Sequence, residues 1–225
     1  MLMYGWMKWV ELAPERYDWA VSLMTAGRLD RIKDLIAGQI NTGDRVLDLG
    51  SGTGTLALRC LRQGASVTCL DSSVAMIEKT RRIAAAAGYG DQIRLVNDSM
   101  TRVADNFAPN QFDVITATLA LGEFSQEYRK YILRDCYQLL RPGGLLLIAD
   151  EVYPEKLPAR LLYLNMLLLF WIPQFLILRR VYFPIRNLVE CISDSGFEVS
   201  KVDTWSINSL QLVRAVKRPG AETGK

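Results

Sequence analysis

A glycine-rich run directly after an apolar segment is the first feature of this sequence with chemical potential. Residues 46–54 read Val-Leu-Asp-Leu-Gly-Ser-Gly-Thr-Gly. Gly50 and Gly52 would let the backbone approach a ligand closely, and Gly54 would let the next helix pack tightly on the strand. A pyrophosphate gains nothing from a carboxylate at Asp48, whereas the α-amino group of S-adenosylmethionine (SAM) would, directly or through water. The run therefore favours SAM, although a tight turn without a ligand is the alternative.

A second acidic residue, Asp71, ends the next apolar run, 23 residues after Asp48. About 20 residues is the separation at which an acidic side chain meets ribose hydroxyls in this topology. A carboxylate that accepts two hydroxyl hydrogen bonds orients a ribose strongly. Ser72 follows it, and Met76 would either pack on adenine or belong to the helix core.

Two further apolar runs end in polar residues. Asp98 follows the third run, where it would accept a hydrogen bond from the adenine amino group or cap the following helix. Thr118 ends the fourth run, beneath the expected methionine portion of SAM. We therefore expect the cofactor to be bound by Asp48, Gly50, Ser51, Gly52, Gly54, Asp71, Ser72, Met76, Asp98, Ser99, Met100 and Thr118.

The elements that must position these residues alternate along the chain. Apolar, β-branched runs and segments of helical period follow one another from Asp44 onward. This predicts an α/β fold, a Rossmann-like seven-stranded, mostly parallel sheet with helices on both faces. The last strand should run antiparallel, because the link before it is short. The predicted strands are Arg45–Leu49, Ser66–Leu70, Ile93–Val96, Phe112–Ala117, Leu145–Ala149, Glu198–Asp203 and Leu210–Ala215, and the predicted helices include Thr55–Arg62, Val74–Ala87 and Gln126–Leu140.

The organisation we expect is one domain in four parts. Residues 1–40 would form N-terminal lid helices and 41–153 the SAM-binding core. Residues 154–183 would form an apolar insert or lid, and 184–218 the C-terminal helix with the last two strands.

Composition narrows the chemistry further. The 225 residues contain no histidine, which excludes a histidine base, a catalytic triad and a histidine–zinc site. The four cysteines have no C-x-x-C spacing, which argues against a metal site, and Cys60, Cys69 and Cys136 fall inside apolar runs, which predicts buried free thiols. A net charge of +3 without a Lys/Arg block argues against nucleic acid as a partner.

Three motifs together resemble those of class I SAM-dependent methyltransferases, a group that includes the quinone-ring C-methyltransferases. They are the run from Arg45 to Gly54, then Asp71-x-Ser-x-x-Met76, and then Arg141-Pro-Gly-Gly144. The resemblance covers about Asp44 to Ala215 and implies SAM as cofactor, with S-adenosylhomocysteine as product. The segment from Met7 to Asp18 and the run Ala149-Asp-Glu-Val152 are more narrowly similar to corrinoid protein-associated methyltransferases, which implies a cobalt or corrinoid-protein acceptor.

Acceptor-side residues are harder to predict. Tyr17 resembles a lid tyrosine that covers the sulfonium, with a plain core tyrosine as the alternative. Asp150 and Glu151 follow the fifth predicted strand. They would be either catalytic acids or merely solvated residues at the end of a strand. We expect Tyr17, Asp150 and Glu151 to be the catalytic residues, with Tyr4, Glu123 and Tyr153 as further candidates for a base.

Residues 161–178 are nearly uncharged, with Arg160 before them and Arg179-Arg180 after them. A membrane span is disfavoured, because the last two strands would then lie across the bilayer from the rest of the sheet. Three alternatives stay open: a lid over the acceptor, a peripheral membrane contact through 160–180, or a dimer or partner surface. Because residues 1–10 lack a signal-peptide cleavage site, we expect a cytoplasmic location, with membrane association at the inner face if the second alternative holds.

The function expected from these features is methyl transfer from SAM to a large hydrophobic or protein-bound acceptor. A corrinoid cofactor or corrinoid protein is the first choice, because low-valent cobalt needs no base. C-methylation of a quinone precursor and N-methylation of a lipid are alternatives. A non-catalytic SAM-binding partner module is the alternative from another class.

Overall fold

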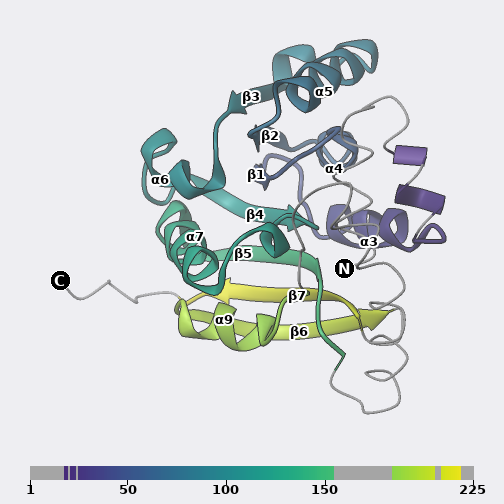
Figure 1. Cartoon of the computed structure of the whole chain (residues 1–225). Helices are drawn as coiled ribbons and strands as arrows, with labels where there is room; N and C mark the ends of the chain where they lie inside the picture. The colour runs from purple at the N-terminus through teal and green to yellow at the C-terminus, as the bar shows by residue number, and fades with distance from the viewer. Residues whose placement is uncertain (1–17, 20, 24, 155–183, 206–208, 219–225) are drawn as a thin grey trace.

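The structure, a computed structural model, describes residues 18–19, 21–23, 25–154, 184–205 and 209–218. Within these residues one sheet has seven strands in the order β3-β2-β1-β4-β5-β7-β6 (Figure 1). All neighbouring strands are parallel except that β7 runs antiparallel to both β5 and β6. The predicted fold class and the antiparallel last strand are confirmed. The strands are β1 (Arg45–Leu49), β2 (Ser66–Asp71), β3 (Ile93–Asn97), β4 (Phe112–Thr118), β5 (Leu140–Glu151), β6 (Phe197–Trp205) and β7 (Leu210–Lys217).

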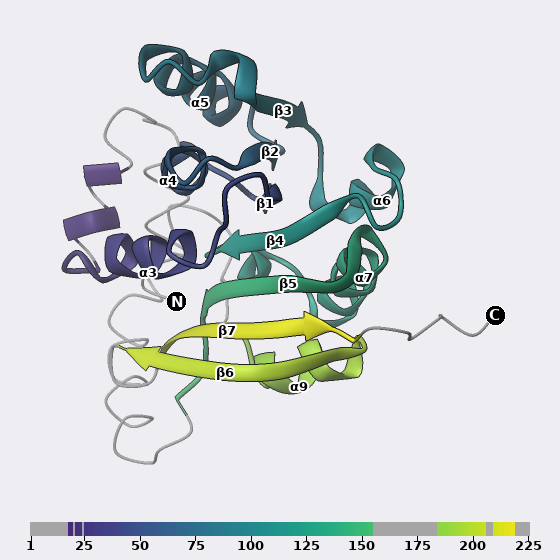
Figure 2. The ribbon, with the colours of Figure 1, turned by 180° about the vertical axis from the view of Figure 1, so that it is seen from behind.

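Helices cover both faces of this sheet (Figures 1 and 2). One buried cluster joins one face of the sheet to α3 and α4, and another joins the opposite face to α6, α7 and α9. The helices are α3 (Arg28–Ala37), α4 (Thr55–Arg62), α5 (Val74–Ala86), α6 (Val103–Asn106), α7 (Gln126–Leu139) and α9 (Leu188–Asp194), with short 3-10 turns η1 (Gly90–Gln92), η2 (Met100–Arg102) and η3 (Leu121–Glu123).

Local sequence signals account for most of these elements. Four of the five residues of β1 are buried, as expected for a parallel strand covered on both faces. Ser73 and Ser125 cap α5 and α7, where their hydroxyl oxygens accept from the backbone N–H of Met76 and Tyr128. All four cysteines are free and buried, as predicted.

The order of the strands reverses at the β1–β4 pair. The chain runs outward from β1 through β2 to β3, then returns to place β4 on the other side of β1. Loops therefore diverge at the carboxyl ends of β1 and β4, which is where open α/β sheets bind ligands. The residues predicted to bind SAM follow these strands.

β5 differs from the prediction. It begins at Leu140, where Leu140 pairs with Phe112, and the register then shifts before Val114 pairs with Leu145. The Pro142-Gly143-Gly144 segment, which lies before the predicted strand Leu145–Ala149, is thus an irregular part of the observed strand, with Gly143 at φ +74°. At the other end, Asp150 and Glu151 belong to β5.

Within the described residues, no helix is long and apolar enough to span a membrane. Most of the predicted apolar insert, residues 155–183, lies outside the described part of the chain, as do Tyr4 and Tyr17.

Candidate functional site

The glycine loop between β1 and α4 packs against two other segments. Gly50, Gly52 and Gly54 all have positive φ, at 62°, 54° and 75°. A Cβ on Gly50 would lie 2.6 Å from the Cβ of Ala120, and one on Gly54 would lie 2.5 Å from the Thr80 methyl group. The first and third glycines are therefore required by contacts within the protein. Gly54 packs on α5 rather than on a strand, which differs from the prediction.

Gly52 is different, because a Cβ there would meet nothing within 4 Å. Its N–H donates to Oδ2 of Asp71 at 2.8 Å, and its carbonyl accepts from the Thr80 hydroxyl at 3.0 Å. Both backbone groups are thus held while the Cα side faces an open pocket. This bare stretch of backbone is the surface that a closely bound ligand requires.

Asp71, the last residue of β2, faces the same pocket. Its Oδ1 accepts from the Ser73 N–H at 2.8 Å, so each carboxylate oxygen is held by one backbone donor. An ionised carboxylate oxygen has two acceptor positions, so each keeps one for a ligand hydroxyl. The side chain therefore fits two adjacent ribose hydroxyls.

Asp48 is almost completely buried, at 2% exposure. Its Oδ1 accepts from the Thr116 hydroxyl at 2.8 Å, while Oδ2 has no hydrogen-bond partner in the described residues. Burial raises the pKa of Asp48 to about 7, against the opposing effects of the Thr116 hydrogen bond and the positive charge of Lys33. A buried carboxylate oxygen without a donor is costly, and an ammonium group or a water would supply one.

This pKa makes ligand binding depend on pH. An ammonium ligand requires ionised Asp48, so the affinity for SAM should rise as pH rises toward 7, the pKa of Asp48. Well below pH 7 we expect about a tenfold loss for each pH unit, measured by calorimetry from about pH 5 to 7, where most of an α-amino group with a pKa of about 8 stays charged. Asp48→Asn should bind more weakly with a flat profile, and a flat profile in the unmodified protein would contradict this assignment.

The pocket collects most of the predicted cofactor residues. Of these, Gly50, Gly52, Asp71, Ser72, Met76, Ser99, Met100 and Thr118 line it. The predicted cofactor residues did not include Ser73 or the segment after β4, which adds Leu119, Ala120, Phe124 and Glu123, the last expected only as a candidate base. Leu119 has φ +52°, rare for a leucine, and its N–H donates to the Ala149 carbonyl at 2.7 Å. No sequence motif marks these four residues. Met76 is 2% exposed and also lines the pocket, so both alternatives for it are compatible with the structure.

Comparison with known proteins agrees with this geometry. A family model described as a methyltransferase domain matches residues 46–144. The ubiquinone/menaquinone biosynthesis C-methyltransferase UbiE of Cereibacter sphaeroides is 32% identical over 142 residues, which cover 60% of this chain and 54% of that protein. The demethylmenaquinone methyltransferase of Beutenbergia cavernae is 33% identical over 152 residues, covering 66% and 58%. The carboxy-S-adenosyl-L-methionine synthase of Desulfotalea psychrophila is 31% identical over 126 residues, covering 54% and 50%.

Solved structures show the same fold. A SAM-dependent methyltransferase from Methanosarcina mazei superposes with a TM-score of 0.64 at 19% identity, covering 82% of this chain and 97% of that one. Residues 46–144 thus match a methyltransferase domain, and this chain shares the fold of a SAM-dependent methyltransferase. It spans little more than half the length of the relatives it matches by sequence.

Asp98 is engaged by its own neighbours. Its carboxylate accepts from the Asn106 amide, the Arg102 guanidinium and the Ser99 N–H, and these bonds lower its pKa to about 2. It does not line the pocket. The geometry therefore shows the structural role, which orders η2 and α6, while its contact with adenine stays a prediction. Ser51, another predicted cofactor residue, acts within the glycine loop through its backbone: its carbonyl accepts from the Gly54 N–H at 3.0 Å.

The two acids at the end of β5 point to opposite faces of the sheet. Asp150 shares a face with Ile148, which packs in the cluster with α7 and α9. Glu151 shares the other face with Ala149, in the cluster with α3. Both residues belong to the strand and are buried, at 0% and 5% exposure. The prediction that they follow the strand was therefore wrong, and so was the alternative that they are solvated.

Asp150 holds the segment after β4 in place. Its Oδ2 accepts from the Leu121 N–H at 2.9 Å, and its Oδ1 accepts from the Glu151 N–H at 2.7 Å. Asp150 and Glu151 therefore have different surroundings. A catalytic role for either one stays a prediction, as does that of Tyr17.

An unpredicted contact ties the N-terminal region to the glycine loop. Oδ1 of Asp18 accepts from the Thr53 hydroxyl at 2.5 Å, and Oδ2 accepts from Nζ of Lys79 at 2.9 Å. Thr53 lies between the second and third glycines, and Lys79 lies on α5. Nearby, Nζ of Lys33 donates to the Thr55 hydroxyl at 2.6 Å, and burial lowers the pKa of Lys33. Asp18 thus joins three segments around the loop.

Asp18→Asn should loosen this junction. The substitution would remove the Asp18 carboxylate from the Lys79 side chain, which is 9% exposed. Because the Asp18 side chain is 35% exposed, the loss of stability should be smaller than for a fully buried ion pair. We expect the free energy of unfolding to fall by about 1–2 kcal/mol and the affinity for SAM to fall severalfold. Urea denaturation and calorimetry measure the two effects. An unchanged denaturation midpoint would show that the contact contributes no stability.

Proposed function

We propose that this protein transfers a methyl group from SAM to a ring carbon of a hydroxylated, quinone-type ring. The observation that carries the proposal is the pocket at the β1–β4 switch point, which Gly52 and Asp71 line with capacity for SAM. Asp48 does not line the pocket, and its contribution is a buried carboxylate oxygen without a donor among the described residues. Similarity to two quinone-pathway methyltransferases supports the acceptor class, because one is a ubiquinone/menaquinone biosynthesis C-methyltransferase and the other a demethylmenaquinone methyltransferase. SAM supplies an electrophilic methyl group: its carbon–sulfur bond breaks as the ring carbon–methyl bond forms, and the ring carbon then loses its proton.

The residues of the chain would act mainly by positioning. Asp71 would orient the ribose, and Asp48 the α-amino group. The segment Leu119–Phe124, held to β5 through Asp150, would wall the pocket on the acceptor side. A displacement of this kind needs alignment and a dry site more than a strong base. The absence of histidine is compatible with an acceptor that is activated by its own ring oxygen.

The comparisons support this acceptor better than the corrinoid expected first from the sequence, because the relatives described above do not include a corrinoid enzyme. A second candidate is chemistry that modifies SAM itself, favoured by the similarity to a carboxy-SAM synthase. The fold alone does not decide, since the [4+2]-cyclase SpnF superposes with a TM-score of 0.67 at 19% identity.

The proposal is tested by incubating methyl-labelled SAM with the purified protein and 1,4-dihydroxynaphthalene, a reduced quinone-type ring. Light-stable label in an organic extract, identified as the ring-methylated product, is the expected result. Asp71→Ala should abolish most of the transfer, whereas Asp91→Ala, an exposed acid on η1, should not.

Other outcomes would favour other functions. Light-labile label on an added corrinoid would favour the corrinoid acceptor, and a SAM derivative that retains the label would favour a synthase. SAM binding without any transfer would favour a binding module.

A further inference from the structure

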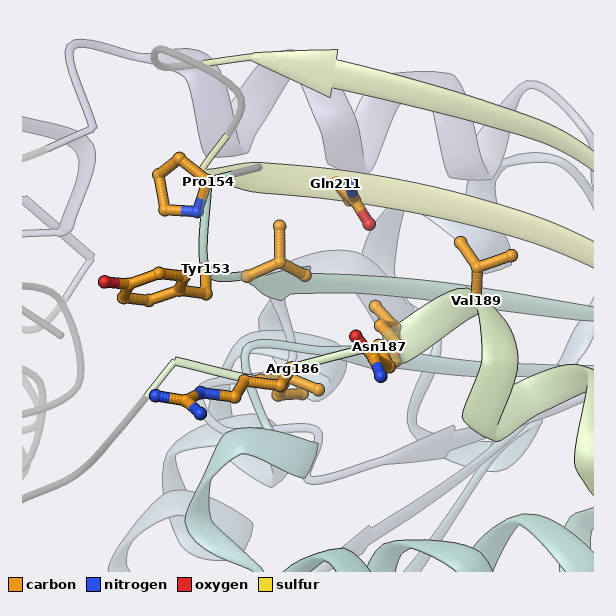
Figure 3. A pocket seen from close by; sticks show the side chains of 9 residues that line it. Tyr153, Pro154, Arg186, Asn187, Val189 and Gln211 are labelled. Carbon is orange, nitrogen blue, oxygen red and sulfur yellow. The ribbon is translucent and has the colours of Figure 1, made fainter. Parts of the chain in front are cut away.

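A second pocket lies at the carboxyl end of β5 (Figure 3). It encloses about 370 Å³, within the range of small-molecule sites, about 300–1,000 Å³. The lining combines apolar and polar side chains: Val152, Tyr153, Pro154, Ile185, Arg186, Asn187, Leu188, Val189 and Gln211. An apolar wall with a few polar groups is typical of a site for a ring that carries oxygen substituents.

The pocket is built on rigid backbone. Ile185, which is completely buried, forms a parallel bridge with Val152 beside the end of β5. The Ile185 N–H donates to the Glu151 carbonyl at 2.9 Å, and its carbonyl accepts from the Tyr153 N–H at 3.0 Å. Tyr153 and Arg186 therefore project from two paired segments whose relative position is fixed.

Arg186 carries the charge of this pocket. Its guanidinium carbon lies 5.4 Å from the centre of the Tyr153 ring, and Figure 3 shows the two side chains extending in the same direction. Stacking on a ring orients a guanidinium and leaves its N–H groups available. Among the described residues no carboxylate pairs with Arg186. An oriented cation that no described carboxylate neutralises is suited to an anionic oxygen.

Two amides add neutral donors. Asn187 follows Arg186, and Gln211 lies near the start of β7, with its side chain directed toward the Asn187 side of the pocket (Figure 3). Neither amide group has a hydrogen bond to another described side chain. The side-chain N–H groups of these amides can donate to a second oxygen on the same ring.

The pocket lies at the same edge of the sheet as the SAM pocket. β4 and β5 are parallel neighbours, and adjacent strands are about 4.8 Å apart. The segment after β4 lines the SAM pocket, and the segment after β5 lines the second pocket. η3 is held to β5 by the Asp150–Leu121 hydrogen bond, so the two pockets share one edge of the sheet.

We propose that this second pocket binds the acceptor through an ionised ring oxygen, with Arg186 as its cationic partner and Tyr153, Asn187 and Gln211 around it. The inference rests on the proposed function and adds where the hydroxylated ring binds and in which form, as its phenolate. The phenol proton leaves to water, and the guanidinium favours the ionised form. The negative oxygen then makes the ring carbons ortho and para to it nucleophilic, which is the activation that a chain without histidine must obtain elsewhere.

Calorimetry with two naphthalenes tests the assignment without SAM and without turnover. The hydroxyl groups of 1,4-dihydroxynaphthalene can ionise, whereas 1,4-dimethoxynaphthalene has the same ring and no group that ionises. The unmodified protein should prefer the dihydroxy compound. Arg186→Gln should lose about tenfold in affinity for it, with the dimethoxy compound unchanged. Arg186→Lys should retain part of the preference, and Arg62→Gln, which removes an exposed arginine from the end of α4, should retain all of it.

The outcomes separate this inference from the proposed function. If the protein methylates the dihydroxy compound and Arg186→Gln binds it equally well, the pocket assignment is wrong and the function stands. If the protein binds SAM but neither binds nor methylates the ring, the proposed function fails first. Arg186-dependent binding of benzoate without binding of the naphthalene would overturn the phenolate in favour of a carboxylate ligand.

Discussion

Asp71→Ala should weaken SAM binding by about one to two orders of magnitude, the effect of stranding hydrogen-bonding partners at about 1–3 kcal/mol. The substitution removes the acceptors for two ribose hydroxyls and also releases the N–H groups of Gly52 and Ser73, which Asp71 holds at 2.8 Å. The bare backbone at Gly52 would then lose its fixed position. Calorimetric titration with SAM measures the loss.

Asp91→Ala is the matched control for this variant, because it removes an exposed carboxylate from η1 at the far end of α5. Urea denaturation of both variants separates weaker binding from partial unfolding. If Asp71→Ala were to bind SAM as tightly as the unmodified protein, Asp71 would have no part in the cofactor site.

Gly54→Ala and Gly52→Ala should fail in different ways. A methyl group on Gly54 would lie 2.5 Å from the Thr80 side chain at φ +75°, so both overpacking and backbone strain apply. We expect the free energy of unfolding to fall by about 2–4 kcal/mol. A methyl group on Gly52 meets no protein atom within 4 Å, so the loss there should be about 1 kcal/mol, from positive φ alone. Its larger effect should be on SAM affinity, because it projects into the ligand space.

Thr80→Ser gives this prediction a second test. Serine removes the Thr80 methyl group nearest to position 54 but keeps the hydroxyl that donates to the Gly52 carbonyl at 3.0 Å. In the Gly54→Ala background it should recover part of the lost stability, measured as a non-additive double-mutant cycle. Strict additivity would mean that strain at position 54, rather than contact with Thr80, dominates.

Local signals were sufficient for the elements and for half of the site. The strands around β1 follow from continuous apolar runs, and the cap of α5 follows from Ser73, because both depend on neighbours within a few residues. The glycine spacing and Asp71 were found for the same reason, since the strand–turn–helix context is contiguous in sequence. The start of β5 was misplaced because its irregular part depends on the register with Phe112, a residue of another strand.

Contacts between distant segments were not predictable in this way. Asp18 reaches Thr53 across 35 residues and Lys79 across 61, and nothing in the local sequence of Asp18 indicates either partner. Asp98 resembles a ligand-binding acid at a strand end, yet Arg102 and Asn106 engage it once the chain turns into η2 and α6.

The sequence by itself determined the α/β fold, the cofactor and the positions of Asp48, Gly52 and Asp71, because apolar period, glycine spacing and strand-end acids are local properties. The tertiary structure alone decided that Asp150 and Glu151 face opposite sides of the sheet, that Asp48 keeps a buried oxygen without a donor, and that Arg186 stacks on Tyr153. Side-chain direction, desolvation and pairing between distant segments depend on how elements pack, and that information is present only when the chain has folded.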